Sequence, residues 1–187
     1  MKIRTKIALF ANIAIIGFGT YLYFNKFYKD IADQMSAQAA IQSAVQEIDY
    51  EKQLDCISKN IYFESRNEGE EGERAVAWVT LNRVATAGYP KTACDVVYQS
   101  KVDKNGNPIK NKCSFSWFCD GKADKIKNNT AWEEAKKIAA DVMAKYGKET
   151  DPTGGAIMYH ADYVKPYWAR DYTREVQINT HIFYVKG

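Results

Sequence analysis

The sequence predicts an α+β fold: a mainly helical domain with a small β-sheet, preceded by a single N-terminal transmembrane helix and a helical tether. An uncharged run, Ile7 to Phe24, lies near the N-terminus, and helix-like apolar patterns continue to about residue 145. Short strand-like segments come last. Helices first and a small β portion afterwards is the order typical of α+β proteins. We therefore expect an anchor over residues 1–24, a tether over 25–53 and a folded domain over 54–187.

The N-terminal run has the length needed to span a membrane. Its residues would form about 27 Å of helix, close to the roughly 30 Å hydrocarbon core of a bilayer. Lys2, Arg4 and Lys6 precede it, and positive charge before an apolar segment predicts an N-terminus in the cytoplasm. We expect a single-pass signal-anchor in the inner (cytoplasmic) membrane, with the domain on the periplasmic side.

Two other interpretations of this run are open. A cleaved signal peptide needs small residues directly after the apolar stretch, but the nearest Ala-x-Ala motif, Ala37 and Ala39, lies far downstream. A buried core helix would not carry the basic flank. The sequence therefore favours an uncleaved anchor. In residues 25–53, apolar residues at near-helical spacing favour a helical stalk over a flexible linker.

Charge and histidine content weigh against several kinds of partner. The formal net charge is only +3, and the basic residues are not gathered into a run, so we expect no nucleic acid partner. The chain has no Cys-x-x-Cys pair, and His160 and His181 are its two histidines. A zinc site therefore has little support, and no metal or cofactor is expected.

The four cysteines fit an exported domain that forms disulfides. The sequence permits all three pairings. A short loop between the last two favours a bond between them, which leaves the first two as the other pair. These residues are Cys56, Cys94, Cys113 and Cys119.

Apolar spacing and turn residues predict the elements of the domain in order. Three helices are expected, the third with a capping box formed by Thr130 and Glu133. A polar loop with an Asn-Gly-Asn-Pro turn and two strand segments around an irregular stretch complete the domain. The ranges are 54–66, 73–86 and 130–145 for the helices, 92–99 for a short helix or strand, 101–112 for the loop, and 156–159 and 176–185 for the strands.

Glu64 is the strongest candidate for a catalytic residue. It follows Ile57 by seven residues and Ile61 by three, so it shares their helix face, which should point inward. A carboxyl group against an apolar wall is desolvated, and desolvation raises its pKa. An acid that stays protonated near neutral pH is what glycosidic bond cleavage requires. The alternative is a buried ion pair, for which Arg83 on the next helix is available.

The segments Asn60 to Gly69 and Glu71 to Val84 resemble the SleB-type cell wall hydrolases, which carry a Tyr-x-Glu box followed by Ala-Val-Ala and Leu-Asn-Arg-Val. Further matches follow in order, and together they cover about Leu54 to Lys186. They are Pro90 to Tyr98, Cys113-Ser-Phe-Ser-Trp117, Cys119-Asp-Gly121, Gly155-Ala156, Tyr159 to Val164, Trp168 and His181 to Tyr184.

This resemblance implies a lysozyme-like domain that cleaves peptidoglycan glycan strands, with Glu64 as the acid. The Glu64-Ser65 pair is similar to the Glu-Ser motif of lytic transglycosylases, which gives Ser65 a place near the substrate. Two residues depart from the family pattern: Asn67 stands where the family usually has Gly, and Glu73 where it usually has Gln. Neither change is expected to inactivate the enzyme, and the negative charge that Glu73 adds near the site is expected to raise the pKa of Glu64 further.

The reaction type depends on a second carboxylate. A hydrolase needs one at a set distance, and the acidic loop supplies Glu68, Glu70, Glu71 and Glu73. A lytic transglycosylase needs only one carboxyl group, and with Glu64 and Ser65 we favour that reaction.

Supporting roles are expected for a further group of residues. Asn82 sits on an apolar helix and must find hydrogen-bond partners, so it orients Glu64, orients a loop or is simply structural. His181, in an apolar strand, is expected to be structural. The residues expected to line the sugar groove are Ser116, Trp117, Tyr159 and His160.

Glycan cleavage of this kind would serve wall remodelling or, in an endolysin, phage lysis. Two other functions remain as alternatives to glycan cleavage. An N-acetylmuramoyl-L-alanine amidase would need zinc ligands, in which the chain is poor. A non-catalytic wall-binding module would need aromatic platforms but no glutamate embedded in a helix.

Overall fold

The computed structural model describes residues 2–187, with side chains from Thr20 onward. The chain divides into two units, residues 1–49 and 50–187. Within the described residues, no helix has a stretch that is both long and apolar enough to cross a membrane. The expected anchor, residues 1–24, lies mostly outside the residues with described side chains, so it stays a prediction.

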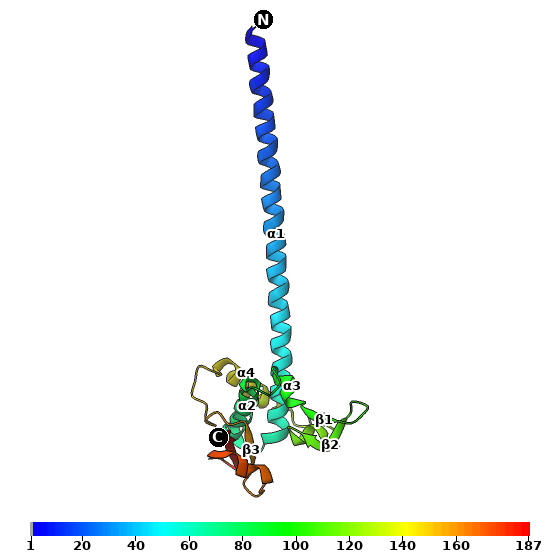
Figure 1. The fold of residues 1–187 in the computed structure, drawn as a ribbon, viewed down its shortest axis with the longest axis vertical. Coiled ribbons are helices and arrows are strands. Elements are labelled where there is room, and N and C mark those ends of the chain that lie inside the picture. Colours follow the sequence, from blue (N-terminus) through cyan, green and yellow to red (C-terminus); the bar gives the residue numbers. More distant parts are fainter. Residues whose placement is uncertain (1) are drawn as a thin grey trace. The chain divides into compact units, whose positions relative to one another are not determined.

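Helix α1 (Lys2–Ser65) passes through the segment expected to be a tether and ends inside the second unit (Figure 1). In the first unit its apolar side chains are exposed, for example Met35 and Ile48 at 69% each. In the second unit Ile57 and Ile61 are fully buried. One helix thus changes from a solvent-exposed rod to a core element, because its apolar residues find packing partners only after residue 50.

Helix α2 (Gly69–Ala85) is the centre of the second unit. It is buried nearly all round, as its sequence predicts. Trp78 packs with the end of α1 and with α4 (Asn129–Lys145), whereas Ala75 and Val79 pack on the C-terminal sheet. The turn before it uses Gly69 at φ +69°, a conformation that favours glycine. The helix therefore begins at Gly69, earlier than the expected Glu73.

Residues 101–112, expected as a loop, form an antiparallel hairpin of β1 (Ser100–Val102) and β2 (Pro108–Cys113). The prediction was wrong because the strands are exposed and carry no apolar alternation. The expected turn is present: the Asp103 carboxylate accepts hydrogen bonds from the backbone N–H groups of Asn105 (2.8 Å) and Asn107 (2.9 Å). Before the hairpin lies α3 (Ala93–Val97), and after it the 3₁₀ helix η1 (Ser116–Cys119).

Helix α4 has a different N-cap from the one expected. Asn128, not Thr130, precedes the helix, and its side chain accepts a hydrogen bond of 3.1 Å from the N–H of Ala131. Thr130 already lies inside the first turn, so it cannot cap the helix. Ile138, Ala139 and Val142 bury the face toward α2.

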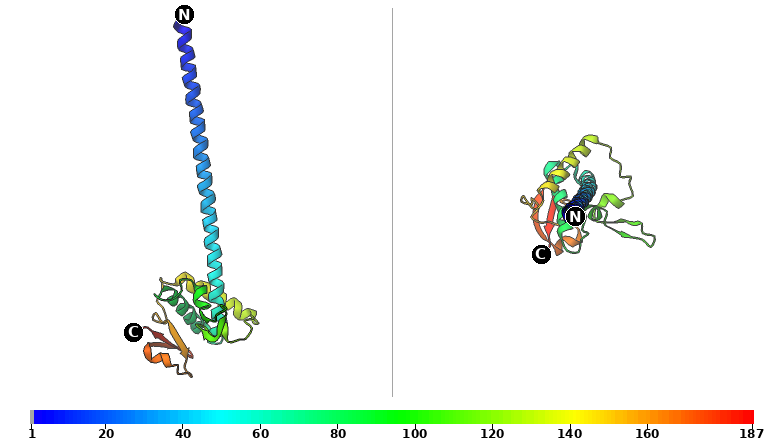
Figure 2. Two further views of the ribbon diagram at one scale, coloured as in Figure 1. Left: turned by 45° about the vertical axis from the view of Figure 1, so that its right-hand side comes forward. Right: turned by 90° about the horizontal axis from the view of Figure 1, so that it is seen from above.

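The C-terminal sheet has three antiparallel strands in the order β3-β5-β4, seen at one end of the unit in Figure 2. They are β3 (Met158–Ala161), β4 (Thr173–Ile178) and β5 (His181–Val185), with the 3₁₀ helix η2 (Tyr167–Asp171) between β3 and β4. The expected single strand over 176–185 is therefore parts of two strands. The chain reverses at Asn179, which has φ 50° and interrupts the apolar pattern.

The cysteines form the two bonds that the loop argument favoured. Cys56 is bonded to Cys94, and Cys113 is bonded to Cys119. The first bond joins α1 to α3, and the second closes the segment between β2 and η1. Both partners of the first bond are buried, so the bond is part of the core.

Candidate active site

Glu64 lies in the last turn of α1, on the same face as two fully buried isoleucines, as its spacing predicts. The backbone reverses directly after it, because the N–H of Glu68 donates to the carbonyl of Ser65 (2.8 Å). The side chain is half-buried. The helix end therefore holds the carboxyl group between the core and solvent.

Two hydroxyl groups from distant parts of the chain meet this carboxyl group. The phenol of Tyr159, on β3, donates a hydrogen bond of 3.0 Å to Oε2. The hydroxyl of Ser116, in η1, donates to Oε1 at 3.4 Å. Burial raises the pKa of Glu64, and the hydrogen bonds from Tyr159 and from the backbone N–H of Trp117 oppose that rise. Because burial dominates, Glu64 is suited to hold a proton that it can give away.

A cleft of about 560 Å³ opens over Glu64. Helix α1, the end of β2, η1 and the C-terminal sheet all contribute to its walls. Glu64 is the only acidic residue among those that line it in the described part of the chain. Its walls include Phe63, Ser116, Tyr159, His160, Tyr163 and His181.

Arg83 also lines the cleft, but it is not an ion-pair partner of Glu64. Its Nε donates to the carbonyl of Ile157 (2.8 Å), and its guanidinium lies 4.7 Å from the ring centre of Phe115. None of the ion pairs within residues 20–187 joins Arg83 to Glu64, and Nη1 of Arg83 is buried without a partner. The alternative of a buried ion pair was therefore wrong, and Arg83 gives this wall a positive charge.

Glu68, the first candidate for a second carboxylate, is held by the turn between β4 and β5. It accepts hydrogen bonds from the backbone N–H (3.1 Å) and the hydroxyl of Thr180. Burial alone would raise its pKa, but these hydrogen bonds hold it below the usual value. Glu68 does not line the cleft. The Glu68 carboxylate is therefore ionised and holds the turn between β4 and β5 in place.

His181 contributes to the site, although its strand context predicted a structural role. It lines the cleft, and its ring lies edge-on to Tyr159 with centres 5.1 Å apart. Its Nδ1 is 3.9 Å from the Glu68 carboxylate and has no hydrogen-bond partner. No local signal in an apolar strand reveals such a position, because it depends on the pairing of β5 with β3.

His160 lines the cleft together with Ser116 and Tyr159, so three of the expected groove residues come together. Its Nε2 is 2.9 Å from the hydroxyl of Tyr184, and its Nδ1 is 2.8 Å from the carbonyl of Ala161. Both ring nitrogens thus have partners within the protein, which fixes the ring as part of the wall.

Two other expected groove residues are buried elsewhere. Trp117 is 7% exposed, its indole N–H donates to Asn60 (3.0 Å), and its ring stacks on Phe63 with centres 4.7 Å apart. Ser65 is 2% exposed and donates back to the carbonyl of Ile61 (3.1 Å). Neither lines the cleft. Phe63, supported from behind by Trp117, lines the cleft in its place.

Asn82 organises the turn before the C-terminal sheet and does not orient Glu64. Its amide donates to the Asp151 carboxylate (2.7 Å) and to the carbonyl of Ala156 (3.0 Å), and its oxygen accepts from the hydroxyl of Tyr146 (3.0 Å). Among the possibilities that the sequence left open, the structure supports the one in which Asn82 orients a loop.

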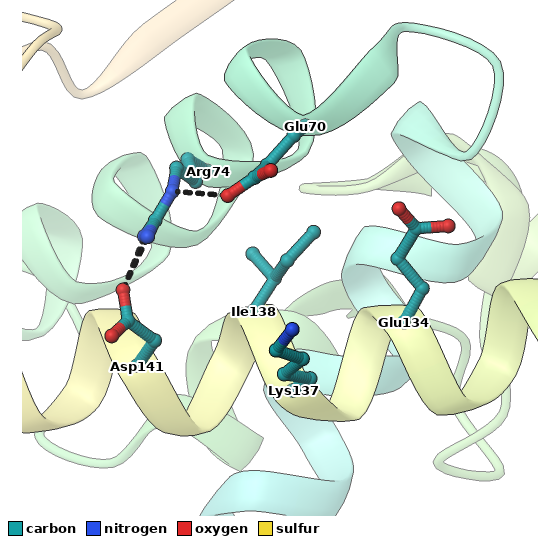
Figure 3. Close-up of a pocket in the computed structure, with 6 residues that line it drawn as sticks. All are labelled: Glu70, Arg74, Glu134, Lys137, Ile138 and Asp141. Atoms are coloured by element: carbon teal, nitrogen blue, oxygen red, sulfur yellow. Dashed lines mark hydrogen bonds and ion pairs between the residues drawn. The ribbon is translucent and has the colours of Figure 1, made fainter.

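Glu73 does not line the cleft. It lies beside a groove between α2 and α4, near Glu70 and Glu134. Figure 3 shows this groove, in which Arg74 bonds Glu70 and Asp141. Glu73 is 4% exposed, and burial followed by the charges of Glu134 and Glu70 raises its pKa to about 7. Glu73 is not among the groups that shift the pKa of Glu64. The expectation that Glu73 would raise the pKa of Glu64 was therefore wrong.

The site combines a single half-buried carboxyl group at a helix end with an open polar cleft above it, an arrangement suited to an enzyme that works by acid and base catalysis. Among the described residues, no cluster of three acidic, histidine or cysteine side chains is arranged to hold a metal ion.

Comparison with known protein families assigns the chain to a family. The profile of the Cell Wall Hydrolase family matches residues 67–184, and the chain belongs to that family. Two spore cortex-lytic enzymes are similar to it. That of Bacillus cereus is 30% identical over 131 residues, and that of Oceanobacillus iheyensis is 27% identical over 131 residues. Each match covers 70% of this chain. The chain spans only 43% and 40% of these relatives.

Two solved structures share the fold of the second unit. The catalytic domain of the Bacillus cereus SleB protein has a TM-score of 0.54 and 29% identity, over 72% of this chain and 91% of that one. The catalytic domain of a germination-specific lytic transglycosylase, SleB from Bacillus anthracis, has the same TM-score and identity, over 71% and 93%. The expected mainly helical fold with a small sheet is thereby confirmed.

Proposed function

We propose that the chain cleaves the glycan strands of peptidoglycan as a lytic transglycosylase, with Glu64 as acid and then base. The observation that carries this proposal is the raised pKa of a carboxyl group that opens into a cleft in which no other acid lines the wall among the described residues. The similarity to a lytic transglycosylase catalytic domain supports the same reaction.

In the first step protonated Glu64 donates its proton to the oxygen that links two sugars, while the bond from that oxygen to the anomeric carbon breaks. The anomeric carbon takes on positive charge, and Glu64 becomes a carboxylate. Tyr159 and Ser116 stabilise that carboxylate, because both donate hydrogen bonds to its oxygens.

In the second step the Glu64 carboxylate removes the proton of the C6 hydroxyl group of the same muramyl sugar. The freed oxygen attacks the anomeric carbon and closes a 1,6-anhydro ring, and Glu64 is again protonated. This route needs no second carboxylate, which fits a cleft in which Glu64 is the lone acid. Hydrolysis would instead need a second group to activate water, and the Glu68 carboxylate is occupied by Thr180.

The proposal is tested by digesting purified sacculi with the full chain in detergent and with its Glu64→Gln variant, followed by mass spectrometry of the soluble products. Anhydromuropeptides are expected from the wild type and none from Glu64→Gln. Reducing muramyl ends would mean hydrolysis, and free peptides would mean an amidase. Binding without any product would mean a wall-binding module, and full activity in Glu64→Gln would refute the role of Glu64.

The proposal extends to location: residues 1–24 anchor the enzyme in the inner membrane with the domain toward the wall. Its support is the uncharged run behind Lys2, Arg4 and Lys6. Such an enzyme serves wall remodelling or phage lysis. Fractionation of cells that express the full chain, or a chain lacking residues 2–24, tests the anchor. Release of the enzyme from membranes on depolarisation would favour phage lysis.

A further inference from the structure

A second hollow of about 460 Å³ lies beside the cleft, at the base of the β1–β2 hairpin. It shares two lining residues, Cys113 and Ser114, with the cleft over Glu64. Lys101 and Lys112 also line it, and no acidic residue does in the described part of the chain. A strand that leaves the cleft past Ser114 therefore meets a positively charged surface.

No ion pair among the described residues neutralises Lys101 or Lys112. None of the ion pairs formed by residues 20–187 includes any other lysine of the hairpin. The one acid of the hairpin, Asp103, accepts hydrogen bonds from Asn107 and Asn105 in its own turn, and these hold its pKa below the usual value. The hairpin lysines are Lys101, Lys104, Lys110 and Lys112, all exposed.

The two lysines of the hollow come from neighbouring strands. Ser100 pairs with Cys113, which places Lys101 and Lys112 next to that pair on facing strands. Like charges on facing strands destabilise a hairpin. An anion between them would relieve this repulsion, so the arrangement favours an anionic ligand.

We propose that this hollow binds the carboxylates of the peptide attached to the muramyl sugar. The proposal rests on the proposed function. While the peptide is attached, the lactyl carboxyl group of the muramyl sugar is held in an amide bond and the sugar backbone carries no charge, whereas the peptides carry free carboxylates. Because the hollow continues the cleft, a peptide borne by a sugar near Glu64 lies within reach of it. Lys101 and Lys112 thus select strands that carry acidic peptides over strands with amidated peptides and over strands that lack peptides and have amidated lactyl groups.

The experiment measures KM and kcat of the full chain in detergent on three soluble strands: with free peptide carboxylates, with the same carboxylates amidated, and with the peptides removed and the lactyl carboxylates that this frees amidated. We expect KM for the first strand to be about tenfold lower than for the other two, as two exposed charge pairs would give. Lys101→Gln/Lys112→Gln loses this difference and keeps kcat. Lys101→Arg/Lys112→Arg retains the difference, and added salt reduces it in the wild type.

The matched control removes two positive charges elsewhere, at the exposed Lys148 and Lys186. Lys148→Gln/Lys186→Gln should discriminate as the wild type does. Equal KM values on all three strands in an active wild type would overturn the proposal, as would unchanged discrimination in Lys101→Gln/Lys112→Gln. The proposal would also be overturned if KM depended on phosphate polymers added to the strands and not on the peptide carboxylates.

A binding measurement separates this proposal from the proposed function. Glu64→Gln is titrated with the three strands, and the dissociation constant should follow the peptide carboxylates. If the wild type cuts no strand but Glu64→Gln binds in this order, the proposed function fails and the anion-binding role of the hollow stands. If cleavage proceeds but binding ignores the carboxylates, the hollow fails alone.

Discussion

Tyr159 and Glu64, 95 residues apart in the chain, are joined by a hydrogen bond of 3.0 Å from the phenol to Oε2. The bond links the C-terminal sheet to the end of α1. Burial raises the pKa of both groups, and that of Tyr159 rises well above its usual value. Tyr159 therefore keeps its proton and acts as a permanent hydrogen-bond donor toward the carboxyl group of Glu64.

Tyr159→Phe is expected to move the alkaline limb of the pH–rate profile to higher pH. The phenol favours the ionised form of Glu64, so its loss raises the pKa of that carboxyl group further. Glu64 then stays protonated to higher pH. The measurement is kcat/KM against pH on soluble glycan strands. Tyr172→Phe, which leaves the carboxyl group untouched, is the control. A limb that stays in place or moves to lower pH would contradict this role of Tyr159.

The direction of Glu64 could be predicted from sequence because it is a local property. Ile57 and Ile61 lie on the same helix face, and their full burial carries Glu64 inward. The partners of Glu64 could not be predicted in the same way. Tyr159 and His181 reach it through the pairing of β3 with β5, and such long-range pairings leave no trace in local spacing. The family resemblance pointed to the segments but not to these contacts.

The misassigned elements have a common physical origin. The β1–β2 hairpin is exposed, so its sequence lacks the alternation that half-burial imposes on a strand. Trp117 is aromatic and close to the site, but the buried Asn60 offers its indole N–H an acceptor, and the ring turns into the core. Glu73 belongs to the same helix as Arg83 but lies near Glu70 and Glu134 and does not line the cleft. In each case the tertiary partner decided the outcome.

Glu73→Gln is expected to stabilise the protein at alkaline pH and to have little effect at acidic pH. The folded protein raises the pKa of Glu73 from 4.5 to about 7. Folding therefore favours the protonated form, and stability falls as pH rises from about 4.5 to about 7. At pH 8 the full penalty applies, on the order of 2 kcal/mol, whereas near pH 4 it is absent.

Urea denaturation of wild type and Glu73→Gln at pH 4 and pH 8 measures this effect. The neutral amide should raise the free energy of unfolding at pH 8 only. Glu71→Gln removes an exposed charge from the same turn and should change little at either pH. A Glu73→Gln variant that is equally stabilised at both pH values would show that packing, not charge, is responsible.

The two disulfides should differ in their effect on stability. The Cys56–Cys94 bond closes a loop with a sequence separation of 38, and the Cys113–Cys119 bond one of 6. Loop-closure entropy predicts losses of about 4 and about 2 kcal/mol when each pair is replaced by serine. Thermal unfolding of both double variants, with the reduced wild type as reference, gives the comparison. A larger loss from the shorter loop would contradict the entropic account.

Two aromatic residues near the cleft have different surroundings: Trp117 packs behind another ring, and Tyr163 is exposed to a sugar that enters the cleft. Trp117 is 7% exposed behind Phe63, whereas Tyr163 lines the cleft and is 83% exposed. Trp117→Phe leaves the oxygen of Asn60 without its donor and should cost about 1 to 3 kcal/mol of stability, with KM unchanged. Tyr163→Ala removes an exposed face on which a sugar ring can pack.

We expect Tyr163→Ala to raise KM for glycan strands about fivefold, equivalent to about 1 kcal/mol, and to leave the melting temperature unchanged. Tyr163→Phe keeps the ring and should retain the KM of the wild type. Tyr28→Ala removes another exposed tyrosine, 65% accessible and far earlier in the chain, and serves as the control. The opposite pattern, in which Trp117→Phe raises KM and Tyr163→Ala lowers stability, would place the sugar on the buried ring. That outcome would require the stack of Trp117 on Phe63 to open when substrate binds.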